Sequence, residues 1–184
     1  MPLRRSLSGL MLACAAFPGL LQAAPFAYVP NEKSATVSVI DTATDKVADT
    51  LPGGKRPRGI ATDGQRLFIS EAPSSSLVVV DIARRQLQRS IRLGESPEGV
   101  SVSADGSLVA AAVEESNSVT LIQAASGKIL ADIKVQGKNP EHAVFSPDGR
   151  WLLVSAEEAE QVDLIDVAAR KQVASIPVGR RPRG

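Results

Sequence analysis

The feature that most constrains the fold of this chain is a repeat of about 42 residues that runs through most of the sequence. A proline opens each repeat, at positions 57, 97, 140 and 182, with spacings of 40, 43 and 42 residues. Asp-Gly pairs at 63–64, 105–106 and 148–149 keep the same period. Each repeat holds four short apolar runs rich in Val, Ile and Leu, separated by turn signals, which is typical of β-strands. The chain therefore repeats a unit of four strands.

Four strands in 40–45 residues is the signature of a β-propeller blade, so the predicted fold class is all-β. The predicted domain of repeats covers residues 24–184. It contains a partial blade at 27–52 that lacks its innermost strand, and four-stranded blades at 57–94, 97–135 and 140–178. Residues 180–184 begin a next blade. We therefore expect about four blades in an incomplete ring.

The residues at 27–64 resemble the YVTN family of β-propeller repeats. Tyr28-Val29-Pro30-Asn31 stands where that family has Tyr-Val-Thr-Asn, and TVSVID at 36–41 matches it closely. The joints GKRPRG (54–59) and GRRPRG (179–184) are similar to those of periplasmic propellers associated with quinoprotein (PQQ)-dependent catabolism, and of cytochrome d1-type propellers. The resemblance implies seven blades, which need about 300 residues at this period. We expect either the N-terminal part of a longer propeller or self-association of two open arcs.

Residues 1–23 are predicted to be a secretory signal peptide. Arg4 and Arg5 form a positive region, 7–21 is apolar, and Leu21-Gln22-Ala23 is a small-residue cleavage site. The predicted localisation is periplasmic or secreted, with no membrane span after cleavage; a retained anchor and lipidation of Cys14 are the alternatives. Because Cys14 is the sole cysteine, cleavage after Ala23 would exclude disulfides, thiolate catalysis and Cys-ligated metals from the mature chain.

Charge and motifs exclude several function classes. Without Arg4 and Arg5 of the predicted signal peptide, the sequence has 19 basic and 20 acidic residues. Because these charges nearly balance, no electrostatic attraction to nucleic acid is expected. The chain has no Gly-x-Ser-x-Gly, phosphate-binding glycine loop or His-Glu-x-x-His pattern. Its single histidine, His142, rules out a multi-histidine metal site. No catalytic residue is therefore assigned.

The candidate site is the mouth of the central channel, where the innermost strands of propellers start. The residue after each repeat proline is charged: Arg58, Glu98, Glu141 and Arg183. The next residue is glycine in three repeats and His142 in the other. We expect these five side chains to ring one mouth, where they could bind a small polar ligand, or where His142 could ligate a haem. The alternative is a solvated rim of paired charges, preceded by the loop cations Lys55, Arg56, Arg180 and Arg181.

The first functional hypothesis is an exported, non-catalytic binding or scaffold propeller without a cofactor of its own. A protein or small-molecule partner would bind at its mouth or rim, within quinoprotein (PQQ)-dependent oxidation as the resemblance implies. The alternative is a cofactor-bearing oxidoreductase or electron-transfer propeller resembling cytochrome d1, with a haem d1-type group or a PQQ-linked partner. A third hypothesis is a lactonase-like hydrolase, since some propellers of this broad group hydrolyse lactones.

Overall fold

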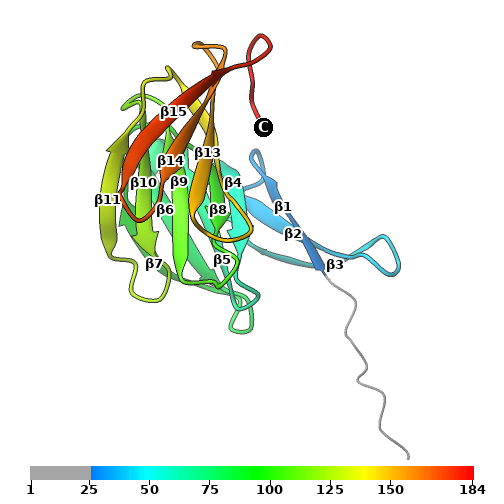
Figure 1. Ribbon diagram of the computed structural model, residues 1–184. Coiled ribbons are helices and arrows are strands. Elements are labelled where there is room, and N and C mark those ends of the chain that lie inside the picture. The colour runs from blue at the N-terminus through cyan, green and yellow to red at the C-terminus, as the bar shows by residue number, and fades with distance from the viewer. Residues whose placement is uncertain (1–25) are drawn as a thin grey trace, which may run out of the picture.

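The computed structural model describes residues 26–184, which form fifteen β-strands in four antiparallel sheets (Figure 1). The all-β prediction is confirmed, and the predicted signal peptide lies outside the described residues. Blade 1 contains β1 (Phe26–Asn31), β2 (Thr36–Asp41) and β3 (Lys46–Pro52). Blade 2 contains β4 (Pro57–Thr62), β5 (Arg66–Glu71), β6 (Ser76–Asp81) and β7 (Gln86–Arg92). Blade 3 contains β8 (Pro97–Val102), β9 (Leu108–Val113), β10 (Ser118–Gln123) and β11 (Ile129–Lys134). Blade 4 contains β12 (Pro140–Phe145), β13 (Trp151–Ala156), β14 (Gln161–Asp166) and β15 (Lys171–Pro177).

Aspartates that end the third strand of a blade fix the turn into the fourth. The Oδ1 atom of Asp41 accepts a hydrogen bond from the backbone N–H of Ala43 at 2.8 Å. Asp81 accepts the equivalent bond from Arg84 at 2.7 Å, and Asp166 accepts one from Ala169 at 2.9 Å. The recurring aspartates are thus turn caps, a role that suits an Asp side chain at the end of a strand. A short 3₁₀ helix, η1 (Ala72–Ser74), replaces the tight β5–β6 turn of blade 2 and was not predicted.

The core lies between the blades rather than inside any one of them. Val37, Val39 and Leu51 of blade 1 pack against Leu67 and Ile69 of blade 2. Similar clusters fill the blade 2–blade 3 and blade 3–blade 4 interfaces. Because a middle blade is covered on both faces, β6 is buried along its whole length, in keeping with its nearly continuous apolar sequence.

Each joint between blades turns through a residue in the left-handed region, directly before the repeat proline. These residues are Arg56, Ser96, Asn139 and Arg181, with φ between 51° and 55°. The innermost strands that follow, β4, β8 and β12, lie side by side around the channel, and β1 lies against β4. The described blades form an arc that is not closed into a ring, with blade 1 at one end and blade 4 at the other (Figure 1).

Candidate functional site

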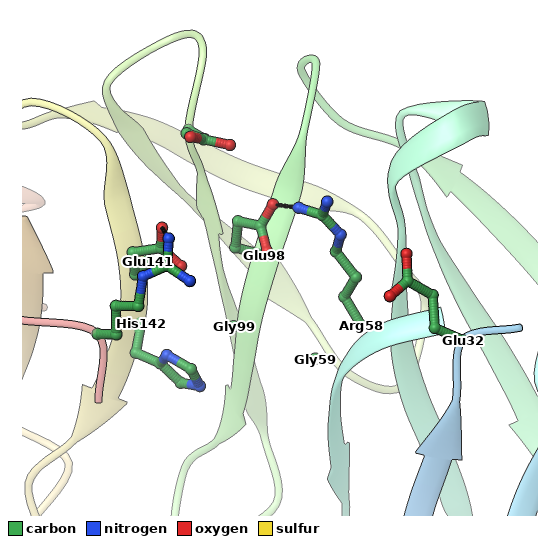
Figure 2. A pocket seen from close by; sticks show the side chains of 9 residues that line it. Glu32, Arg58, Gly59, Glu98, Gly99, Glu141 and His142 are labelled. Carbon is green, nitrogen blue, oxygen red and sulfur yellow. Dashed lines mark hydrogen bonds and ion pairs between the residues drawn. The ribbon is translucent and has the colours of Figure 1, made fainter. Parts of the chain in front are cut away.

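A polar cavity of about 500 Å³ lies at one mouth of the channel. All five residues predicted from the sequence line it: Arg58, Glu98, Glu141, His142 and Arg183 (Figure 2). Two carboxylates that the sequence analysis missed, Glu32 and Glu114, complete the charged wall together with the backbone of Gly59 and Gly99. The identical offset from the repeat proline thus brings side chains from successive blades to one place.

Irregular pairing at the start of each innermost strand directs these side chains towards the channel. The register between the first and second strands shifts directly after Pro57, Pro97 and Pro140. Such bulges re-aim side chains. In blade 2 the hydroxyl of Ser70 secures the bulge, accepting a bond from the N–H of Gly59 at 2.7 Å and donating one to the carbonyl of Glu98 in the next blade. Ser70 therefore ties the mouth residues of two blades together.

The first charged pair of the mouth joins blades 2 and 3. The guanidinium of Arg58 forms an ion pair with the carboxylate of Glu98 (Figure 2). Glu98 is buried, so this pair is shielded from water more than an ordinary surface pair is. The hydroxyl of Ser96 bridges Glu98 and Glu114, at 3.2 and 2.8 Å from their carboxylate oxygens.

The second charged group joins Glu141 to Glu157, which follows β13 and is buried. Burial, and then the hydrogen bond to Glu157, raise the pKa of Glu141 to about 7. The pKa of Glu157 falls to about 2, because Glu141, Arg181 and Arg183 all donate hydrogen bonds to it. Arg183 lies 3.0 Å from both carboxylate oxygens of Glu157 and 4.0 Å from Glu141. Below about pH 7 and above about pH 2 the two carboxyls therefore share one proton, held on Glu141.

The remaining two mouth carboxylates differ in their partners. Arg56 donates a hydrogen bond to Glu32 at 3.1 Å and lowers the pKa of that carboxyl. Glu114 accepts only neutral donors within residues 26–184, the hydroxyl of Ser96 and the side-chain amide of Asn139 at 3.2 Å. Of the loop cations, Arg56 pairs with the mouth carboxylate Glu32, Arg181 pairs with Glu157 beside the mouth, and Arg180 lies 3.7 Å from Glu160.

His142 occupies the place of a glycine and is exposed to the channel. A Cβ atom on Gly99 would lie 2.5 Å from Cδ2 of the His142 imidazole, so the ring lies directly against the backbone of blade 3. Within residues 26–184, no hydrogen bond joins the imidazole to a hydroxyl or a carboxylate, and no group of three or more His, Cys, Asp or Glu side chains is arranged to hold a metal ion. The described part of the chain also contains no helix long and apolar enough to cross a membrane.

The carboxylates that the sequence analysis missed occupy the same position in their repeats. Glu32 and Glu114 directly follow β1 and β9, which hold the same place in the repeat, and Glu157, which does not line the cavity, follows β13 in the same way. Blade 2 has Ala72 there, and Glu71 instead accepts a bond from the backbone N–H of Lys55. Aligning the repeats on their second strands as well as their prolines would have shown this second set of residues.

Comparison with known proteins supports the fold. No family model matches the chain, and no curated protein matches it. Among solved structures, 1296 chains match, so a likeness in fold does not by itself select a function. One of them is the hydrazine synthase of Kuenenia stuttgartiensis, with a TM-score of 0.76 and 27% sequence identity. The match covers 82% of this chain and 45% of that one, so the chain spans less than half the length of this solved relative.

Proposed function

We propose that this chain is an exported, non-catalytic binding propeller whose charged mouth receives a polar group from a small molecule or a protein partner. The observation that carries the proposal is the cavity of about 500 Å³, walled by ionisable side chains from all four blades. Small-molecule sites are concave and are often formed where structural units meet. Catalysis has less support, since His142 lacks a hydroxyl or carboxylate partner within residues 26–184.

The wall of the cavity favours a ligand that carries both signs of charge. Arg58 pairs with Glu98, and Arg183 lies 4.0 Å from Glu141, so each of these four charges is within reach of an opposite one. A ligand with an ammonium and a carboxylate can replace these partners without leaving an unpaired charge behind, whereas a ligand with a single charge cannot.

Binding of a dipolar ligand can be tested with the dipeptide glycylglycine. The midpoint of thermal unfolding should rise with glycylglycine and stay unchanged with acetate or methylammonium, because each of these offers one charge only. Arg58→Gln and Glu98→Gln should abolish the rise. Arg92→Gln, which changes an exposed arginine on the outermost strand of blade 2, should retain it. Equal shifts with all three solutes, or none, would contradict a dipolar site.

A role in quinoprotein (PQQ)-dependent oxidation, and membership of the YVTN family, form the finer part of the proposal. Their support is the resemblance of the YVPN segment and of the GKRPRG and GRRPRG joints. The solved neighbour bears the name of a synthase, which agrees with a propeller that serves a larger enzyme. Affinity capture on the exported protein should then retain a PQQ-dependent dehydrogenase from the same periplasm, and recovery of no such enzyme would count against this role.

The haem-bearing alternative depends on His142, which offers a cavity-lining imidazole as an axial ligand. The other lining residues fit a porphyrin poorly, because all are charged side chains or glycines and no apolar side chain covers the cavity wall. An absorption band in the visible range from the purified protein, lost in His142→Gly, would favour this alternative over the binding module. Hydrolysis of a lactone by the purified protein would favour the hydrolase.

A further inference from the structure

Glu114 is the one carboxylate of the mouth cavity that has no cationic partner within residues 26–184. The other three carboxylates that line the cavity, Glu32, Glu98 and Glu141, each lie within 4.0 Å of an arginine. Glu114 accepts hydrogen bonds only from the Ser96 hydroxyl and the Asn139 side-chain amide, at 2.8 and 3.2 Å. Hydrogen bonds from charged donors are roughly twice as strong as those from neutral ones. A cation that enters the cavity can therefore gain an ion pair at Glu114 without displacing an arginine.

Glu114 lies beside Glu98 because both carboxylates are in contact with Ser96. The Ser96 hydroxyl lies 2.8 Å from Glu114 and 3.2 Å from Glu98. A hydroxyl carries one hydrogen, so it can donate to only one of these two carboxylates at a time. An ammonium group has three N–H donors and can contact both carboxylates at once.

The carboxylate of Glu114 is held in position from the joint before blade 4. Asn139 donates from its side-chain amide to Glu114, and from its backbone N–H to the side chain of Asn117 at 3.0 Å. Both contacts join the start of blade 4 to blade 3. Glu114 is thus oriented before a ligand arrives, and such preorganisation lowers the cost of binding.

Arg58 supplies the opposite charge for the other end of a dipolar ligand. Its sole ion-pair partner within residues 26–184 is Glu98 (Figure 2). Arg183, by contrast, lies 3.0 Å from both carboxylate oxygens of Glu157 and is already engaged there. An ammonium that pairs with Glu98 releases the guanidinium of Arg58, whose planar fork suits the carboxylate of the same ligand.

The wall of the cavity favours an ammonium that carries N–H groups over a quaternary one. The residues that line the cavity include no Phe, Tyr or Trp. A quaternary ammonium has no N–H to donate and is recognised through aromatic faces. Carboxylates such as Glu98 and Glu114 instead accept N–H donors, so the wall suits a primary amine.

We infer that the ligand of the mouth is a primary amine that also bears a carboxylate, with its ammonium bound between Glu98 and Glu114 and its carboxylate bound to Arg58. Amino acids and short peptides with a free N-terminus belong to this class. The inference rests on the proposed binding function and assigns the two ends of its dipolar ligand. It makes Glu114 the residue that selects for the amine.

Isothermal titration calorimetry on the purified exported protein tests the assignment with two probes. Glycylglycine should bind, whereas N,N,N-trimethylglycylglycine, which keeps both charges but has no N–H on its ammonium, should not. Glu114→Gln should weaken glycylglycine binding about tenfold or more, because a hydrogen bond between two charged groups is lost. Glu115→Gln is the matched control, since Glu115 is the next residue, is exposed and does not line the cavity. It should bind glycylglycine as the wild type does.

The outcomes separate this inference from the binding function on which it rests. If the wild type does not bind glycylglycine, the dipolar site itself is wrong and the assignment falls with it. If the wild type binds and Glu114→Gln binds equally well, the dipolar site stands but Glu114 does not hold the ammonium. Equal binding of the trimethyl derivative would overturn the preference for a primary amine. Should Glu114→Gln fail to fold, Glu114→Asp, which keeps the charge but shortens the side chain, should fold and bind more weakly than the wild type; unchanged affinity would overturn the assignment.

Discussion

His142 and Gly99 contact each other across the joint between blades 3 and 4, and the glycine is what allows the imidazole to lie there. A Cβ atom at position 99 would lie 2.5 Å from Cδ2 of His142 and 2.7 Å from the carbonyl oxygen of Glu141. Such distances are far below van der Waals contact. The innermost strands of these two blades are therefore as close as a residue without a side chain permits.

Gly99→Ala should destabilise the protein by about 1–3 kcal/mol, the usual cost of inserting a methyl group into a filled space. Urea unfolding followed by circular dichroism measures the change. Gly179→Ala serves as the control, because a Cβ atom there meets no atom within 4 Å. Combining Gly99→Ala with His142→Gly should recover only part of the loss, since the Glu141 carbonyl remains in place. Full recovery would show that the imidazole alone fills the space.

His142→Gly by itself restores the residue that the other repeats carry at this position. We expect a loss of less than about 1 kcal/mol, the entropic cost of a glycine in a strand. Thermal unfolding and the visible spectrum should be recorded on the same sample. A large loss of stability accompanied by loss of an absorbing group would contradict the cofactor-free binding module.

The paired carboxyls predict how the stability depends on pH. Folding raises the pKa of Glu141 from its ordinary value of 4.5 to about 7, so this group favours the folded state below pH 4.5 and its contribution is lost as the pH rises to about 7. Folding lowers the pKa of Glu157 to about 2, so its contribution is present above pH 4.5 and is lost as the pH falls towards 2.

Glu141→Gln imitates the protonated acid at every pH. Relative to the wild type, this variant should gain stability between pH 5 and pH 8 in denaturant titrations. Glu115→Gln, which changes an exposed glutamate between β9 and β10 of blade 3, should follow the wild-type curve. A Glu141→Gln curve parallel to the wild type over this range would show that Glu141 does not hold the shared proton.

The Arg58–Glu98 pair can be measured with a double-mutant cycle. Arg58→Gln and Glu98→Gln, singly and together, should give a coupling free energy of about 0.5–3 kcal/mol, as expected for residues in direct contact. The coupling should persist in high salt, because Glu98 is buried and its field is little screened. A coupling free energy near zero would mean that the pair belongs to a solvated rim of paired charges, which is the alternative given in the sequence analysis.

Export predicts a new N-terminus. Mass spectrometry of the protein from an exporting host should find a chain that starts at or near Ala24, as the predicted cleavage site requires. Membrane-bound protein that keeps Met1 would instead support a retained anchor, and a lipid-modified Cys14 would support the lipoprotein alternative.

The repeat predicted the fold and five of the seven ionisable side chains that line the mouth, for a simple physical reason. Innermost strands start at the same height in every blade, so a constant offset from Pro57, Pro97 and Pro140 is enough to bring Arg58, Glu98 and Glu141 together. Which charges pair with one another could not be predicted in this way. Arg183 donates a hydrogen bond to Glu157, which directly follows β13. This pairing depends on side-chain rotamers and on burial, and the spacing of the repeat contains no information on either.

The mouth residues also differ from the rest of the repeat in how freely they can change. Arg58, Glu98, Glu141 and Arg183 each follow a repeat proline directly, and none of them belongs to the hydrophobic clusters between the blades. Duplicated blades could therefore diverge at this one position while the hydrophobic interfaces stayed the same. The charge of the mouth thus depends largely on the single residue that follows each repeat proline. Four substitutions at these positions should change that charge without altering the scaffold.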